Sequence, residues 1–187
     1  MKRWLIVAAA AALGACGQMA GGEPPLPAVQ QGAQAPMQLH PAQGVREANV
    51  TQQVRTQLLD QIKTLLDQTQ AQFAAGLTPV QGLTDEVKPM HPGNDHRWRV
   101  HLNGGTPYVF IGACDGDCNN IDIELIDMHT GGVVASDVLP DDYPVVQFTP
   151  PATADYMARV ILQTCTTAPC YVGMRALTTG PASTGGK

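Results

Sequence analysis

The sequence predicts a mainly β protein, an antiparallel β-sandwich preceded by one amphipathic helix and a disordered tether. Three observations support this prediction. Residues 121–125 alternate between apolar and acidic side chains, which is the period of a strand with one buried face. Similar short segments, separated by turn residues, recur through the second half of the chain. The first half holds one stretch with helical periodicity, and before it a stretch with none.

The first sixteen residues resemble the export signal of bacterial lipoproteins. Lys2 and Arg3 precede an apolar run over residues 4–12 that is too short to span a bilayer. The L-G-A-C motif at 13–16 resembles a lipobox, which implies that residues 1–15 are a signal peptide and that Cys16 carries lipid. Gly17 follows the cysteine, and by the enterobacterial rule this favours the outer membrane over the inner one. The alternative is an ordinary signal peptide that leaves Cys16 as a free thiol.

The formal net charge and the four cysteines after Cys16 limit the partners and the kind of site that the sequence predicts. Loss of Lys2 and Arg3 with the signal peptide would move the formal charge from −5 to −7. A nucleic-acid partner is not expected, because phosphate binding needs a basic surface. An even number of cysteines in an exported chain predicts disulfides, here the local pairs Cys114–Cys118 and Cys165–Cys170. Cross-pairing, or a zinc site made by all four thiolates, is the alternative.

Residues 16–48 are predicted to be a flexible tether. They are rich in Gly, Pro, Ala and Gln and contain few large apolar side chains. A segment of this composition buries too little surface to offset the conformational entropy lost on ordering. A flexible coil of this length spans about 30 Å on average, so the folded part is expected to stand away from the membrane.

Residues 49–76 are predicted to form the amphipathic helix. Asn49 with Gln52 resembles a capping box, and Gly76 suits a left-handed residue after the last turn. The apolar side chains recur mostly at spacings of three and four and form one stripe: Val50, Val54, Leu58, Ile62, Leu65, Leu66 and Phe73. The stripe is expected to pack on the following domain, the alternative being a partner helix or a short coiled coil.

Residues 77–94 are predicted to be a connecting segment, residues 95–177 a β-sandwich domain and residues 178–187 a disordered tail. Because side chains alternate along a strand, Trp98, Val100 and Leu102 are expected to face one way, and Arg97, Arg99 and His101 the other. Later strands are expected at about 107–113, 121–127, 132–136, 144–149, 155–164 and 170–177. Seven short strands with this spacing are typical of a sandwich.

The sandwich segment also resembles a known family. The resemblance rests on Y-x-x-x-G-x-C-D-x-D-C at 108–118, I-D-I-E-L at 121–125, P-V-V-x-F at 144–148, Tyr156 and the pair Cys165 and Cys170. Together they resemble the bacterial pre-peptidase C-terminal domain and its cysteine-bearing relatives. The resemblance implies a small jelly-roll-like sandwich that aids secretion or binds substrate beside a peptidase, with calcium bound in some members. The chain departs from that pattern because its 187 residues include no peptidase.

The sequence gives little support to an enzyme. Its two serines, Ser136 and Ser183, lie outside any G-x-S-x-G motif, and the histidines form no H-E-x-x-H motif. His91, His96 and His101 are interpreted as surface residues. We therefore expect a lipid-anchored cell-envelope protein with a non-catalytic binding module. The alternative is a structural or docking component of an envelope assembly, and a hydrolase is the least favoured class.

The acidic loops are the candidate binding site. If every neighbouring strand is antiparallel, the loops 114–120, 137–143 and 165–169 share one end of the sandwich. The candidate residues there are Asp115, Asp117, Asp137, Asp141 and Asp142. Alternating oxygen ligands suit calcium, but Asn120 stands where an EF-hand loop needs glycine, so no cofactor is expected and calcium stays open. The alternative is that the carboxylates cap their own turns. The expected partners are the membrane, through the anchor, and an envelope protein or polysaccharide.

Overall fold

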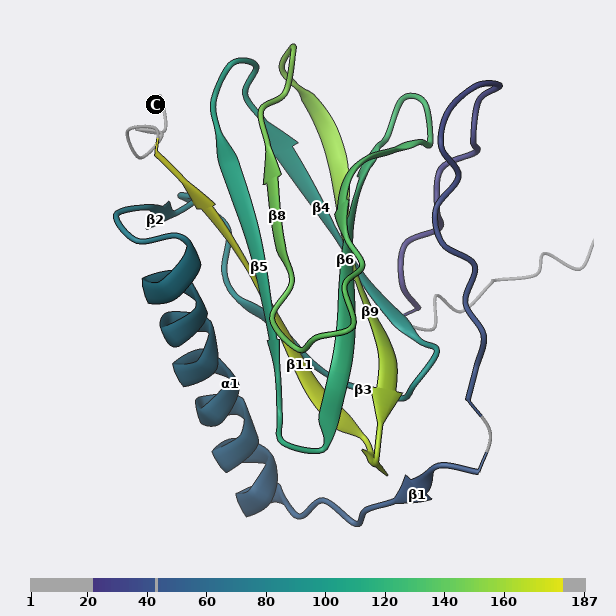
Figure 1. The fold of residues 1–187 in the computed structure, drawn as a ribbon, viewed down its shortest axis with the longest axis vertical. Coiled ribbons are helices and arrows are strands. Elements are labelled where there is room, and N and C mark those ends of the chain that lie inside the picture. Colours follow the sequence, from purple (N-terminus) through teal and green to yellow (C-terminus); the bar gives the residue numbers. More distant parts are fainter. Residues whose placement is uncertain (1–21, 43, 180–187) are drawn as a thin grey trace, which may run out of the picture.

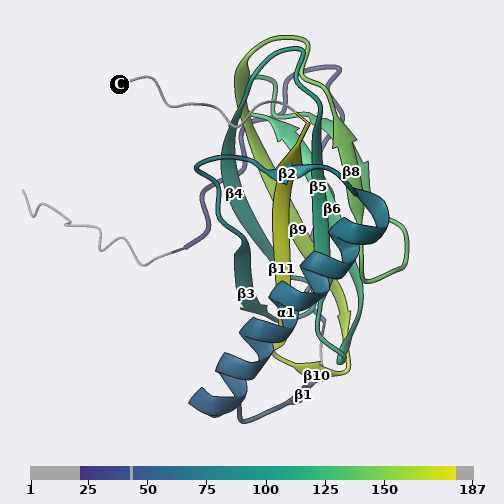
Figure 2. The same cartoon turned by 90° about the vertical axis from the view of Figure 1, so that its left-hand side faces the viewer.

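The computed structural model describes residues 22–42 and 44–179 (Figure 1). The predicted signal peptide, the predicted lipidation site Cys16 and most of the predicted tail lie outside these described residues. Within them, two antiparallel sheets lie face to face, with one helix on one side and an extended N-terminal segment on the other (Figures 1 and 2). The predicted antiparallel β-sandwich with a preceding helix is confirmed.

The first sheet, called the helix-side sheet, has the order β2-β11-β5-β8, and β3 also pairs with β11. Its strands are β2 (Thr78–Pro79), β3 (Glu86–Met90), β5 (Tyr108–Cys114), β8 (Val145–Phe148) and β11 (Cys170–Thr178). The second, called the strap-side sheet, has the order β4-β9-β6-β7. Its strands are β4 (Asp95–Leu102), β6 (Cys118–Asp127), β7 (Val133–Asp137) and β9 (Ala154–Cys165). A short parallel pair joins β1 (Arg46–Glu47) to β10 (Thr167–Ala168).

The core between the sheets follows the alternation expected from the sequence. Ile121, Ile123 and Leu125 of β6 point inward and are fully buried, and Val100 and Leu102 of β4 join the same cluster. All seven strands predicted after residue 95 are present. The connecting segment 77–94 differs from the prediction, because it contains β2 and β3. The sandwich therefore begins at β2, and Pro89 and the charged residues of β3 hide the strand character of β3 in the sequence.

Helix α1 (Gln52–Phe73) closes the outer face of the helix-side sheet. Its N-cap is Thr51, whose Oγ1 accepts a hydrogen bond from the Val54 amide, so the predicted Asn49–Gln52 capping box is wrong. Ile62 and Leu66 are fully buried against β5 and β11, so packing on the domain, rather than a partner helix, accounts for this part of the stripe. Gly173 of β11 permits the contact, because a β-carbon there would collide with Ile62.

Arg175 of β11 ties α1 to the sheet by charge. Its guanidinium donates to both Asp85 oxygens, at 2.8 and 2.7 Å, and to Asp67 and Gln70 of α1, at 2.7 and 2.9 Å. These partners raise the pKa of Arg175 above its ordinary value, chiefly through the Asp85 hydrogen bonds. The side chain is only 8% exposed, so its charge is compensated within the protein.

The predicted flexible tether is wrong for the part that the structure describes. Residues 22–42 and 44–48, called the strap, run along the outer face and edge of the strap-side sheet (Figure 1). Backbone hydrogen bonds join Gln30 to Thr130 and Val133 to Gln34, and Ala48 donates to Ala168 at 2.7 Å. Backbone hydrogen bonds to the sheet hold the strap in position. Amino-acid composition alone does not predict such hydrogen bonds, so the strap was interpreted as flexible.

Charged side chains lie buried beneath the strap. Arg159 of β9 is 1% exposed; it donates to Glu124 at 2.8 Å and to the Met37 carbonyl at 2.9 Å, and it also pairs with Asp95. The Met37 amide in turn donates to Glu124 at 2.9 Å. Beside them, Asp122 accepts from Gln163. The outward residues of β6 and β9 are thus sealed from water by the strap, although the acidic ones looked solvent-facing in the sequence.

Candidate functional site

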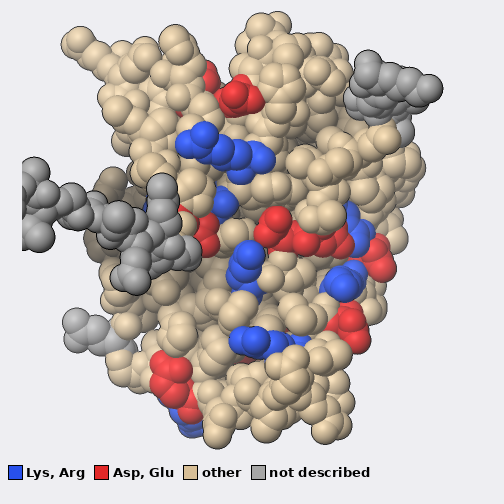
Figure 3. All heavy atoms as spheres, turned by 180° about the vertical axis from the view of Figure 1, so that it is seen from behind, with Lys and Arg blue, Asp and Glu red and all other residues tan. Residues whose placement is uncertain are grey.

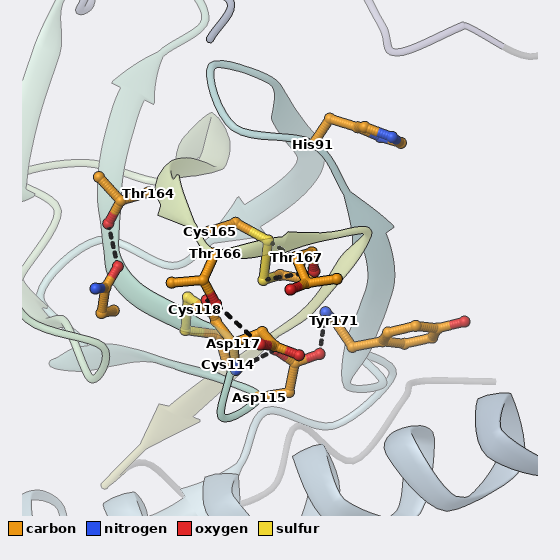
Figure 4. Close-up of a disulfide and its surroundings, with 12 residues drawn as sticks. His91, Cys114, Asp115, Asp117, Cys118, Thr164, Cys165, Thr166, Thr167 and Tyr171 are labelled. Carbon is orange, nitrogen blue, oxygen red and sulfur yellow. Dashed lines mark hydrogen bonds between the residues drawn. A yellow bond between two sulfur atoms is a disulfide. The ribbon is translucent and has the colours of Figure 1, made fainter. Parts of the chain in front are cut away.

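Both disulfides lie at one end of the sandwich, where the candidate loops meet (Figure 4). Cys114–Cys118 closes the turn between β5 and β6, and Cys165–Cys170 closes the segment between β9 and β11. Cys118 and Cys165 are also paired residues of neighbouring strands, so the two bridges are adjacent. The predicted local pairing is confirmed, and the bridges leave none of these four sulfurs as a thiolate for zinc.

Asp115 and Asp117 of this turn hold the end together. The Asp115 carboxylate accepts hydrogen bonds from the Tyr171 amide at 2.7 Å and the Asp117 amide at 3.3 Å (Figure 4). Burial raises the pKa of Asp115, and these amide bonds oppose the rise. Asp117 accepts from the Thr166 hydroxyl at 2.9 Å, which joins the β5–β6 turn to the β9–β11 connection. Both carboxylates therefore act in loop structure.

The third loop, between β7 and β8, reaches the same region by a longer path. Asp137 accepts from the Val145 amide at 2.8 Å and the Leu139 amide at 3.2 Å, and so shapes the loop. Asp141 accepts from the Tyr143 amide at 3.2 Å, while its carbonyl accepts from the Ile121 amide at 3.0 Å. These are turn-capping bonds, which is the alternative that the sequence left open for the acidic loops.

The candidate loops come together, and most of their carboxylates are engaged by neighbouring backbone amides. Within residues 22–42 and 44–179, no three His, Cys, Asp or Glu side chains are grouped so that they could hold a metal ion. Asp115, Asp117, Asp137 and Asp141 use their carboxylates on backbone amides or a hydroxyl instead. Asp142 faces a different feature, the groove beside α1.

Phe73 and Tyr143 line this groove, and two further exposed apolar residues, Val138 and Leu139, lie on the same β7–β8 loop as Tyr143; we call these four residues the apolar lip. Their exposed fractions are 40% for Phe73, 50% for Val138, 62% for Leu139 and 45% for Tyr143. The rings of Phe73 and Tyr143 stack with centroids 5.5 Å apart and planes 10° from parallel. The stack links the last turn of α1 to the β7–β8 loop, so the lip is held by two elements.

The groove itself is small and mixed in character. It has a volume of about 170 Å³, a floor of Ala113 and Cys114, and walls from α1 and the β7–β8 loop that include Gln72, Asp142 and Tyr143. A groove of this size suits one inserted side chain rather than a whole small molecule, because ligand pockets usually exceed about 300 Å³. Its apolar rim with a neighbouring carboxylate is typical of a protein-binding surface.

Sequence reasoning missed the apolar lip, although it selected Asp141 and Asp142 beside it. Val138, Leu139 and Pro140 follow a predicted strand, where turn residues are normally polar. That apolar run inside a turn was the available signal. Phe73 was assigned to the buried stripe of the helix, yet it is half exposed because α1 extends past the sheet contact made by Ile62 and Leu66.

A second hollow, of about 540 Å³, lies where the described chain begins. Gly22, Lys88, His91, Asn94 and His96 are among the residues that line it. His96 is 8% exposed, which corrects its interpretation as a surface residue. Its ring nitrogens contact Glu23 at 2.7 Å and Glu86 at 3.3 Å, so the imidazole is held on both sides. None of the described residues that line the hollow is a serine or a cysteine, and Ser136 lies on β7.

No protein-family model matches this chain, and no curated protein matches it. The resemblance to the pre-peptidase C-terminal domain therefore stays a prediction, and so does the lipobox. Among the described residues, no helix has the length and apolar character needed to cross a membrane.

Proposed function

We propose that this chain is a lipid-anchored cell-envelope protein whose sandwich is a non-catalytic module that binds another envelope protein through the apolar lip. The anchor would be Cys16, and Gly17 favours the outer membrane. The observation that supports the binding role is the apolar exposure of the β7–β8 loop, in which Leu139 is 62% exposed and Tyr143 stacks on Phe73 at an open groove. Apolar and aromatic side chains gathered in this way are typical anchors of protein interfaces.

The composition of the site favours a protein over a polysaccharide partner. Leu139, Val138 and Tyr143 offer apolar surface, whereas the carboxylates of Asp137 and Asp141 are engaged in turns of the same loop. A partner that places an apolar side chain in the groove and a basic group near Asp142 would match both features. Calcium is not needed for this role.

A photo-crosslinking experiment tests the binding surface. A photoreactive phenylalanine analogue at position 139 should yield one discrete crosslinked product in intact cells. The matched control is position 64 of α1, which is exposed and does not line the groove. Leu139→Asp should remove the partner from the purified complex and leave the melting temperature unchanged. Equal crosslinking from both positions, or from neither, would contradict the binding role.

The anchor has its own test. Cys16→Ser should abolish acyl labelling and release the protein from the membrane fraction. Persistence of the label in this variant would contradict the lipobox.

A structural component of an envelope assembly is the second candidate, favoured by the rigid seating of α1 through Arg175. It predicts a constant stoichiometry between the protein and its crosslinked partner under all growth conditions.

A further inference from the structure

We infer that β4 accepts an extended segment of another protein as an added strand along residues 99–101, with a carboxylate of that segment placed against Arg99. This binding edge is separate from the apolar lip. Three features support it: the direction of the β4 backbone groups, a hollow beside them, and the charge of Arg99.

Strand β4 is an outer strand of the strap-side sheet, because β9 is its only neighbour in the order β4-β9-β6-β7. In an antiparallel pair, the N–H and C=O groups of successive residues point alternately toward the partner strand and away from it. The N–H of Arg97 donates to Glu23 of the strap at 2.8 Å, so it points away from β9. Arg99 and His101 follow at intervals of two, so their N–H and C=O groups also point away from β9.

The strap covers this edge only at Arg97. The Arg97 side chain also donates to the Pro24 carbonyl at 2.8 Å, and the strap then leaves β4 for the turn between β6 and β7. Among residues 22–42 and 44–179, no hydrogen bond joins the outward backbone groups of Arg99 or His101 to another segment. Outward N–H and C=O groups on an edge strand are the groups with which an extended peptide pairs when it adds to a sheet.

A hollow of about 320 Å³ lies beside the open part of β4. It is lined by Arg99, Val100, His101, Met128 and Asp155. Directly opposed residues of antiparallel strands have their side chains on the same face of the sheet. The residues of an added strand that pair with Arg99 and His101 would therefore place their side chains over this hollow, with Met128 as an apolar contact.

Arg99 determines which charge fits opposite it. Its side chain is exposed, and within the described part of the chain no ion pair joins it to a carboxylate, whereas Asp155 contacts His101 at 2.7 Å. Figure 3, which looks onto the β4 side, shows basic and acidic side chains intermixed. Recognition therefore depends on the residue directly opposite Arg99 and not on a field from the whole face. Opposite charges in a cross-strand pair are favourable, so a carboxylate fits there.

A second copy of this chain fits the same edge less well. Antiparallel pairing of two β4 edges over the open residues sets Arg99 of one copy opposite His101 or Arg99 of the other, and neither supplies a carboxylate. The apolar lip would stay free, because β4 and β7 are opposite edges of the strap-side sheet. In Figure 2 β4 lies on the left, and the green β7–β8 connection lies on the right.

Amide hydrogen exchange, followed by NMR on the mature chain, tests the added strand. In the free protein, the outward amides of Arg99 and His101 should exchange fast, and those of Val100 and Leu102, which face β9, slowly. The probe is the peptide T-V-T-V-E-V-T. At about ten times its dissociation constant, it should slow exchange at Arg99 and His101 about tenfold and leave Val100 unchanged, because only the free edge exchanges. The same peptide N-methylated at its glutamate keeps every side chain but lacks a backbone donor, and it should give no protection.

Substitutions test the role of Arg99 in the same measurement. Arg99→Glu should weaken binding of T-V-T-V-E-V-T and strengthen binding of T-V-T-V-K-V-T, each about two- to fivefold. Lys63→Glu, the matched change of charge on an exposed position of α1, should alter neither.

Three results would overturn the inference. Absence of protection at Arg99 and His101 with millimolar peptide, or equal protection by the N-methylated peptide, would exclude strand addition. Slow exchange of both amides in the free protein at every concentration would show that the edge is already covered. Protection that grows with protein concentration, without peptide, would make a second copy the occupant.

Discussion

The two outer faces of the sandwich are both covered, but by opposite chemistry. On the helix-side sheet, Ile62 and Leu66 of α1 pack on apolar residues of β5 and β11. On the strap-side sheet, the strap covers Arg159, Glu124 and Asp122, which are at most 4% exposed. One cover is a regular element with an apolar stripe. The other is an extended chain whose bonds are made by its backbone and by buried charges.

Because of this difference, substitutions beneath the two covers should change the free energy of unfolding in different ways. Apolar packing weakens in proportion to the contacts removed, because the cavity left behind sets much of the cost. A buried ion pair behaves differently, because removing one partner leaves the other charge without compensation. The strap-side face should therefore be the more sensitive of the two to single substitutions, and the following experiments compare them.

The largest expected effect is at Arg159. Arg159→Met keeps an unbranched side chain of similar length but leaves Glu124 buried without its guanidinium partner, while Asp95 keeps its pair with Arg97. We expect a loss of about 3–5 kcal/mol in the free energy of unfolding, measured by urea denaturation. The Met37 amide should also exchange its hydrogen faster, because its acceptor Glu124 loses its counter-charge.

Two further variants define what this loss means. Arg99→Met, on an exposed position of β4, should change the stability by less than about 0.5 kcal/mol. Arg159→Met combined with Glu124→Gln should recover much of the loss, because Asp95 keeps its pair with Arg97 and no buried carboxylate is left unpaired. A small effect of Arg159→Met alone would mean that the strap does not depend on the ion pairs.

The helix-side face should respond less steeply. Leu66→Ala removes a fully buried side chain from the α1 contact and should cost about 2–4 kcal/mol by urea denaturation. Val54→Ala, at a position of the same helix that is 41% exposed, is the matched control and should cost less than about 0.5 kcal/mol. If both variants cost the same, the helix contributes through propensity and not through packing.

The smallest expected effect is a dependence of the free energy of unfolding on pH, which comes from a carboxyl group of the strap-side face. Burial raises the pKa of Asp122 above 3.8, and repulsion from Glu124, Asp137 and Asp141 adds to the rise, against the Gln163 hydrogen bond. The folded state then holds the proton more tightly than the unfolded state. The stability from this group is present below the unfolded pKa and is lost as the pH rises through the folded pKa.

Asp122→Asn tests this sign. The variant should gain stability relative to the wild type as the pH is raised from about 4 toward neutrality, because the amide stays uncharged. Asp60→Asn, on the exposed side of α1, is the control and should show no such gain. Melting curves across the pH range give the comparison, and parallel curves for Asp122→Asn and wild type would contradict it.

Period-2 alternation was enough to predict the strands of the sandwich, and helical spacing was enough to predict α1. In residues 121–125 and 98–102, the alternation of apolar and polar side chains directly predicts which face of each strand is buried. The strap was missed because its order depends on contacts such as Met37 with Arg159, which are 122 residues apart. Strand β3 was missed because Pro89 and the charges around it weaken the pattern.

The candidate site was predicted in part for a similar reason. Antiparallel topology correctly brought the 115–117 turn, the β7–β8 loop and the 166–169 segment together, as the Thr166–Asp117 and Ile121–Asp141 bonds show. Topology does not say where each carboxylate points. The Asp115 carboxylate points inward and accepts a hydrogen bond from the Tyr171 amide. The exposed side chains are instead Leu139 and Tyr143, and their exposure depends on the path of the β7–β8 loop.

The strap also sets an order of events during folding. Its residues are synthesised before the sandwich, yet their partners on β9 and β10 come more than a hundred positions later. The segment has no stable place until the last third of the chain has been made and paired, because it has no regular structure of its own to hold it. Under the proposed lipid anchor, the N-terminus would be fixed first and the strap would be the last segment to pack. The protein would then complete its fold beside the membrane.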